Sequence, residues 1–164
     1  MKKILVLSLF ALMFVACNLA KDSVKMKPDL EVTSISPLAA TLYVTDTVSG
    51  TTSEISTIEF RSKNSVDCTV NKVIIEYRNE DNSVFYGPFS MAIYMKVSGI
   101  VNPDSVTVYS IENIPLAADK VAQHMLQNNL LVTKAYIGIV SEDDYDMGRT
   151  DTAWVWFGFN FINQ

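Results

Sequence analysis

Two stretches near the C-terminus decide the fold: LVTKAYIGIVS at positions 131–141 and TAWVWFGFNFI at 152–162. Every odd position from 153 to 161 is apolar, which is the alternation of a strand with one buried face. The odd face of the first stretch carries Leu131, Ala135, Ile137 and Ile139. The pattern predicts two neighbouring antiparallel strands whose odd faces line one core.

The parity of these strands also predicts their register. If the buried faces match, the two residue numbers of each opposed pair add up to an even value. A sum of 292 leaves a short connection between the two strands. Tyr136 then lies opposite Trp156, and Gly138 lies opposite Trp154, on the face turned away from the core. We therefore expect an aromatic platform of Tyr136, Trp154 and Trp156, with Lys134 at its edge.

The platform has three interpretations. In the first, another part of the chain covers the rings. In the second, the rings anchor a protein partner, because Trp and Tyr often carry most of the binding energy of an interface. In the third, a sugar stacks its C–H face on the rings while its hydroxyls stay hydrated. The sequence does not decide among them.

The same two-residue period runs through most of the chain. Seven further stretches show it: 30–36, 41–46, 54–62, 68–79, 83–89, 91–97 and 105–111. Residues 115–129 differ, because their apolar side chains recur at helical spacing after a proline suited to a first turn. The pattern predicts an all-β fold, an antiparallel Ig-like β-sandwich of about 7–9 strands with one short crossing helix near 116–128. It resembles immunoglobulin and fibronectin type III domains in pattern only, and that architecture has many functions.

Positions 1–18, MKKILVLSLFALMFVACN, read as a targeting signal. Residues 4–16 are apolar apart from Ser8, and this run is too short to span a membrane but suits a secretory signal. The sequence Phe14-Val15-Ala16-Cys17 resembles the lipobox of bacterial lipoproteins, although that family prefers Leu at the position of Phe14. The resemblance implies cleavage before Cys17, a diacylglycerol on its sulfur and usually an acylated amino group.

The predicted organisation is a signal peptide over 1–16, a lipidated Cys17 with a polar tether over 17–29, and one β-sandwich domain over 30–164. Ordinary signal cleavage and an uncleaved anchor are alternatives, as is a first strand that starts within the tether. Two or three acyl chains hold a protein on a membrane durably. Asn18 is not the Asp that retains lipoproteins at the inner membrane, so we expect the bacterial cell envelope, with the outer membrane or cell surface favoured.

The charge balance argues against a nucleic-acid partner. The chain has 13 Lys and Arg against 18 Asp and Glu, and removing Lys2 and Lys3 with the signal leaves a net charge of −7. Binding to nucleic acid requires basic surface that replaces phosphate counterions.

The connection SEDDYDMGRTD at 141–151 is acidic enough to suggest calcium. An EF-hand frame that begins at Glu142 fails, because Met147 takes the glycine position and Ala153 takes the final glutamate position. An irregular calcium site is the alternative to a solvated connection, with Asp143, Asp144, Asp146 and Asp151 as candidate ligands. In both cases we expect this end of the sandwich to be the working surface.

Catalytic motifs are missing, and we expect no enzyme. His124 is predicted to be a partly buried, hydrogen-bonded side chain, and Cys68 is predicted to be a small buried one. They could form a thiol–imidazole pair only if the fold brought them together. The expected function is that of a lipid-anchored envelope protein that contacts another protein. The alternatives are a carbohydrate or small-ligand module, with or without calcium, and a hydrolase with two carboxylates in a cleft.

Overall fold

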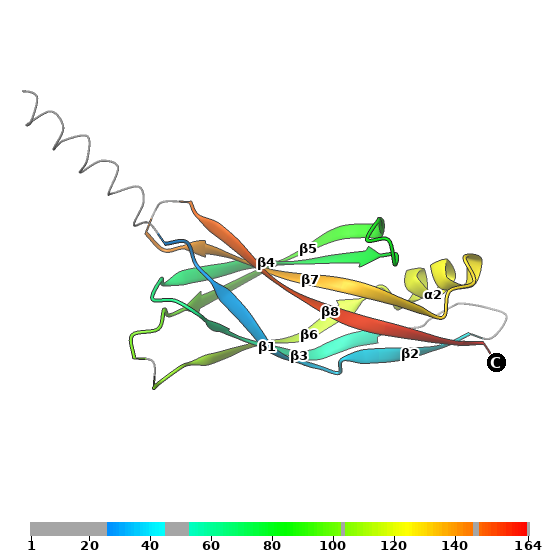
Figure 1. The fold of residues 1–164 in the computed structure, drawn as a ribbon, viewed down its shortest axis with the longest axis horizontal. Coiled ribbons are helices and arrows are strands. Elements are labelled where there is room, and N and C mark those ends of the chain that lie inside the picture. The colour runs from blue at the N-terminus through cyan, green and yellow to red at the C-terminus, as the bar shows by residue number, and fades with distance from the viewer. Residues whose placement is uncertain (1–25, 45–52, 103, 146–147, 164) are drawn as a thin grey trace, which may run out of the picture.

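A computed structural model describes residues 26–44, 53–102, 104–145 and 148–163 (Figure 1). These residues form two packed sheets and one helix, α2 (Ala118–Gln127). The strands are β1 (Leu30–Ser36), β2 (Ala39–Val44), β3 (Ser53–Ser62), β4 (Cys68–Arg78), β5 (Val84–Val97), β6 (Val108–Leu116), β7 (Val132–Asp143) and β8 (Thr150–Asn163). The predicted all-β sandwich with one short helix is confirmed.

One sheet has the order β1-β3-β6 and the other has the order β2-β8-β7-β4-β5. All neighbouring strands run antiparallel except β2, which runs parallel to β8. This parallel edge corrects the expectation of a purely antiparallel sandwich. It arises because the chain leaves one sheet at the end of β1 and joins the other at Ala39, so β1 and β2 lie on opposite layers.

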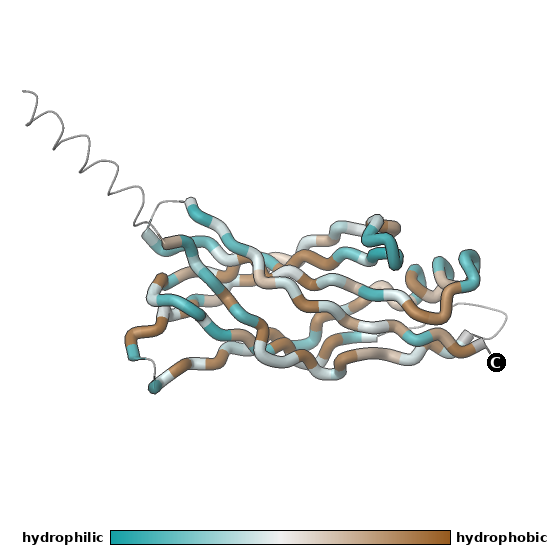
Figure 2. The backbone as a smooth tube through the Cα atoms, viewed as in Figure 1, coloured by the Kyte–Doolittle hydropathy of each residue, from teal (hydrophilic) through white to brown (hydrophobic). Residues whose placement is uncertain are grey.

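The core lies between the two sheets. Hydrophobic and hydrophilic residues alternate along the strands in Figure 2, as expected when each strand has one buried face. The odd face of β8 supplies Phe157 and Phe159, and β3 supplies Ile55, Ile58 and Phe60, all fully buried. Each such side chain contributes roughly 1.5–3 kcal/mol by leaving water, so the core needs no disulfide.

Two element boundaries differ from the prediction. The stretches 83–89 and 91–97 are one strand, β5, which pairs with β4 through several register shifts. β6 continues through Pro115, where the sequence predicts the start of a helix. Proline has no backbone N–H to donate to a neighbouring strand, but it is tolerated here because β6 is an edge strand.

The two ends of the sandwich are different. Helix α2 closes one end, with Ala118, Val121, Ala122 and Met125 buried against the core. The backbone N–H of Ala117 donates to the Tyr77 hydroxyl at 2.7 Å, which joins the start of this helix to β4. The start of β1 lies at the opposite end (Figure 1), which we call the N-terminal end.

Residues 26–29, assigned to the tether, pack on the domain at this end. The Lys27 ammonium lies 2.5 Å from a carboxylate oxygen of Asp151, and the Asn64 amide donates to the carbonyl of Lys27 at 2.7 Å. β1 begins at Leu30, as predicted. The predicted signal peptide and Cys17 lie outside the described residues, and no helix among the described residues is long and apolar enough to cross a membrane.

Candidate functional site

The predicted register of β7 and β8 is confirmed. Tyr136 pairs with Trp156, and Gly138 pairs with Trp154. Both tryptophans project from the outer face of the five-stranded sheet, because the residues between and after them, Val155 and Phe157, point toward the core.

Gly138 makes room for the indole ring of Trp154. A Cβ on Gly138 would lie 3.0 Å from the Trp154 ring carbons Cη2 and Cζ3, so this ring lies against the backbone of the neighbouring strand. A Cβ on Gly158, on the same strand as Trp156, would lie 3.7 Å from Cζ3 of that ring, which is ordinary van der Waals contact, so Trp156 does not depend on a glycine there. Gly138 therefore lets Trp154 lie close to the sheet.

Cations accompany all three rings. The Arg78 guanidinium lies 4.8 Å from the ring centre of Tyr136 and 5.9 Å from that of Trp154, and the Lys134 ammonium lies 5.0 Å from that of Trp156. Glu76 accepts from Nε of Arg78 at 3.0 Å and holds its guanidinium in place. Contacts of this kind contribute about 0.5–1 kcal/mol each at exposed sites.

The rings are accessible. Trp154 is 45% exposed and Trp156 is 44% exposed. The first interpretation, in which another part of the chain covers them, therefore does not describe these two residues. The apolar surface continues along β8 toward the helix end, where Val132, Ile162 and Tyr43 are also exposed.

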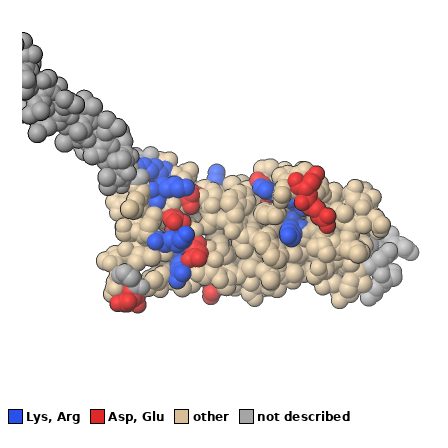
Figure 3. Space-filling model, viewed as in Figure 1, with Lys and Arg blue, Asp and Glu red and all other residues tan. Residues whose placement is uncertain are grey.

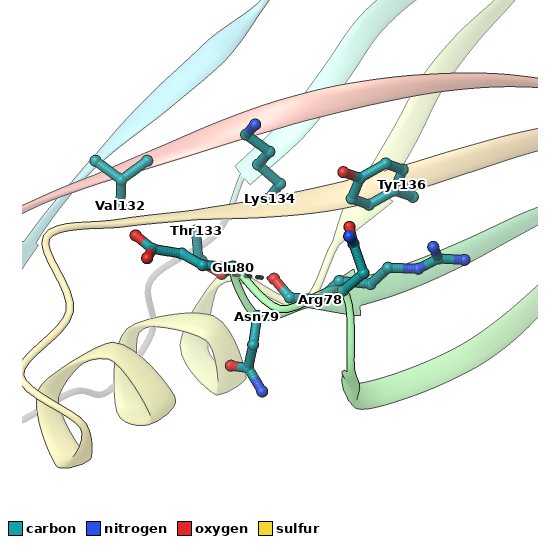
Figure 4. Close-up of a pocket in the computed structure, with 8 residues that line it drawn as sticks. Arg78, Asn79, Glu80, Val132, Thr133, Lys134 and Tyr136 are labelled. Atoms are coloured by element: carbon teal, nitrogen blue, oxygen red, sulfur yellow. Dashed lines mark hydrogen bonds between the residues drawn. The ribbon is translucent and has the colours of Figure 1, made fainter.

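A hollow of about 380 Å³ adjoins the platform, which we call the Tyr136 hollow (Figure 4). It forms where β4 ends and the following turn bends away from the start of β7. Its lining residues are Arg78, Asn79, Glu80, Asn82, Val132, Thr133, Lys134 and Tyr136. The Thr133 hydroxyl donates to the carbonyl of Arg78 at 3.1 Å and joins the two strands at its base.

The hollow lies on the opposite side of the platform from the acidic connection. A second hollow of about 460 Å³, lined by Met26, Lys27, Asp29, Asn64 and Asp151, lies beside the acidic connection, so the expectation that the acidic end is the working surface stays a prediction. Figure 3 shows acidic and basic side chains interleaved, without a large field of one sign on the face in view. The platform differs from the rest of the surface in its shape and its aromatic area rather than in its net charge.

The described calcium candidates, Asp143, Asp144 and Asp151, are not gathered into a site. Asp144 lies 2.8 Å from the Lys96 ammonium and accepts from Thr69 at 2.6 Å, and Asp151 is paired with Lys27. Asp143 is buried, and Asp146 lies outside the described residues. Among the residues that can be described, no group of three or more potential metal ligands exists. The hydrogen bond from Lys96 lowers the pKa of Asp144, followed by that from Thr69.

Cys68 and His124 lie at opposite ends of the sandwich. Cys68 begins β4, whereas His124 Nε2 lies 2.8 Å from Oδ1 of Asn79, just beyond the other end of that strand. The two are thus separated by roughly the length of β4, about 36 Å for eleven residues. Burial raises the pKa of Cys68 to about 11, so its thiol stays protonated. Both side chains have the structural roles that the sequence predicts.

Arg78 and Glu80 are the site residues that sequence reasoning missed. Arg78 shares the outer face of β4 with Glu76, and both belong to the same alternation as the buried residues of that strand. That alternation identifies the face of Arg78, but only the pairing of Arg78 with Lys134 brings it to the platform.

No protein-family model matches the chain, and neither a curated protein nor a solved structure matches it.

Proposed function

We propose that this protein is a lipid-anchored, non-catalytic protein of the bacterial cell envelope, and that the outer face of its five-stranded sheet binds another protein. The proposal rests on the exposure and the contacts of the two tryptophans in the platform. Trp154 and Trp156 are nearly half exposed, yet each lies beside a cation, and Trp154 also lies against Gly138 of the neighbouring strand.

This composition suits a protein interface. Trp, Tyr and Arg are the residues that most often dominate binding energy, and they do so near the centre of a contact surface. Here they lie on β7, β8 and β4, which are inner strands of the sheet, so their positions are fixed before a partner arrives. Preorganised rings lose little conformational entropy on binding.

The platform suits sugar stacking less well. A sugar needs a bare ring face, whereas Arg78 and Lys134 lie over these rings. A protein partner can place carboxylates beside these cations and cover the rings at the same time. We therefore favour a protein contact over a carbohydrate ligand for the platform.

Anchoring through Cys17 agrees with the position of the platform. Residues 18–25 would reach at most about 3.3–3.6 Å each, and they lead to Met26 at the N-terminal end. The apolar surface beyond Trp156 extends toward the helix end. An anchored domain would thus present this surface away from its attachment point.

Site-specific photo-crosslinking in native cells tests the protein contact. A benzophenone side chain at Asn160, exposed on β8 beyond Trp156, should yield an adduct of defined mass. The same group at Glu112, exposed on the other sheet, is the matched control. Trp156→Ala should remove the adduct at position 160. Equal adducts from both positions, or an adduct that Trp156→Ala leaves unchanged, would contradict the proposal.

The anchor has a separate test. The intact mass of the protein extracted from membranes should show acyl chains on a chain that begins at Cys17, and Cys17→Ser should release the protein from the membrane. An unmodified mature chain would refute the anchor and leave the protein contact to stand on the crosslinking result.

A further inference from the structure

Two charged groups in the Tyr136 hollow have no counter-ion. Glu80 and Lys134 both line it, and neither forms an ion pair with another described residue. Figure 4 shows the Glu80 side chain below β7, the Lys134 ammonium extended over β8, and Tyr136 farther along β7. Val132 adds an apolar surface beside them.

The hollow carries no net charge. Glu76 neutralises Arg78 through the hydrogen bonds described above, and Glu80 balances Lys134. A polyanion or polycation therefore gains little there. Hydrogen bonds between charged partners are roughly twice as strong as those between neutral groups. A ligand that brings one carboxylate and one ammonium gains both.

We propose that the Tyr136 hollow binds a zwitterionic α-amino-acid group. Lys134 receives its carboxylate, Glu80 receives its ammonium, and Val132 and Tyr136 contact its side chain. The volume of about 380 Å³ lies at the lower end of small-ligand sites, which span about 300–1,000 Å³, and suits one amino acid better than a folded segment. The source is a free amino acid or the same group at the end of a side chain of a larger peptide.

The platform supplies a reporter for this binding. The Lys134 ammonium lies 5.0 Å from the ring centre of Trp156, and a bound carboxylate would draw it away from the ring. Tryptophan emission should therefore change on binding. Trp156→Phe should remove most of that change without removing the heat of binding in a calorimeter.

Three probes separate the two charges. L-Leucine carries both, N-acetyl-leucine carries only the carboxylate, and leucine amide carries only the ammonium. They are titrated into the full-length protein in a polyoxyethylene detergent, which has neither sugar nor charge. Leucine should bind saturably, and each blocked form should bind at least tenfold more weakly. No saturation with leucine or with a peptide whose side chain ends in a free α-amino-acid group would overturn the inference, as would equal binding of the blocked forms or of maltose.

Single variants assign the contacts. Lys134→Met should abolish the preference for leucine over leucine amide, and Glu80→Gln should abolish the preference over N-acetyl-leucine. Lys72→Met, exposed on the same sheet face, and Glu112→Gln, on the other sheet, should keep both preferences. Unchanged preferences in Lys134→Met and Glu80→Gln, with unchanged melting temperatures, would also overturn the assignment.

The source is identified by comparing leucine with a peptide whose middle side chain ends in a free α-amino-acid group. Tighter binding of the peptide supports an end group, and tighter binding of leucine supports a free amino acid. This inference does not rest on the proposed protein contact. Crosslinking at Asn160 can fail while leucine binds, and the reverse outcome is equally distinguishable.

Discussion

The substitution Gly138→Ala tests how the platform is built. The new Cβ would lie 2.9 Å from Cγ2 of Thr152 and 3.0 Å from two ring carbons of Trp154, where ordinary contact begins at 3.4 Å. Both neighbours are side chains, so the indole must move outward by about half an ångström and lose its contact with the strand. Overpacking of this kind costs about 1–3 kcal/mol, and the lower chain entropy of unfolded Ala returns about 0.4–1 kcal/mol.

We therefore expect Gly138→Ala to lower the free energy of unfolding by up to about 2.6 kcal/mol and to shift tryptophan emission to the red. Urea unfolding followed by circular dichroism measures the first, and fluorescence with acrylamide quenching measures the second. Gly158→Ala is the matched control, since its Cβ would meet Trp156 at 3.7 Å and Ala39 at 3.3 Å. If both variants were equally stable with identical emission, the glycine packing described above would be refuted.

Three further predictions concern stability. Tyr77→Phe should lower the free energy of unfolding by about 1–3 kcal/mol, because it leaves the Ala117 N–H without its acceptor. A similar loss in the control Tyr94→Phe, at an exposed position, would contradict this assignment. Burial raises the pKa of Cys68 from 9.0 to about 11 and that of Tyr77 from 10.0 to about 12. The unfolded chain releases these protons first, so the free energy of unfolding should fall as the pH rises from about 9 to about 12, and Cys68→Ala with Tyr77→Phe should flatten that fall. The lowered pKa of Asp144 stabilises the fold at pH values above 3.8, the ordinary pKa of this carboxyl, and this stability is lost in acid. Asp144→Asn should therefore flatten the acid limb of the profile of stability against pH. Added calcium should not change the melting temperature.

Local patterns determined a large part of this protein. Alternation predicted both faces of β8, and the same parity predicted that Tyr136 faces Trp156. This inference succeeded because β7 and β8 are consecutive and joined by a short connection, so only a few registers bring two apolar faces together. The helix was predicted for an equally local reason, the spacing of Val121, Ala122 and Met125.

Tertiary structure decided what lies beside what. Period-two patterning gives the face of a strand but not its neighbour, so the parallel pairing of β2 with β8 and the position of Arg78 beside Tyr136 were not predictable. The Tyr136 hollow depends on where the turn after β4 departs from β7, a geometry that no residue pattern encodes. The sequence by itself therefore determined the sandwich, its helix and the aromatic rings on one strand pair. The partners of those rings, their exposure and the hollow came from long-range packing, because residues far apart in the chain meet only when the sheets close.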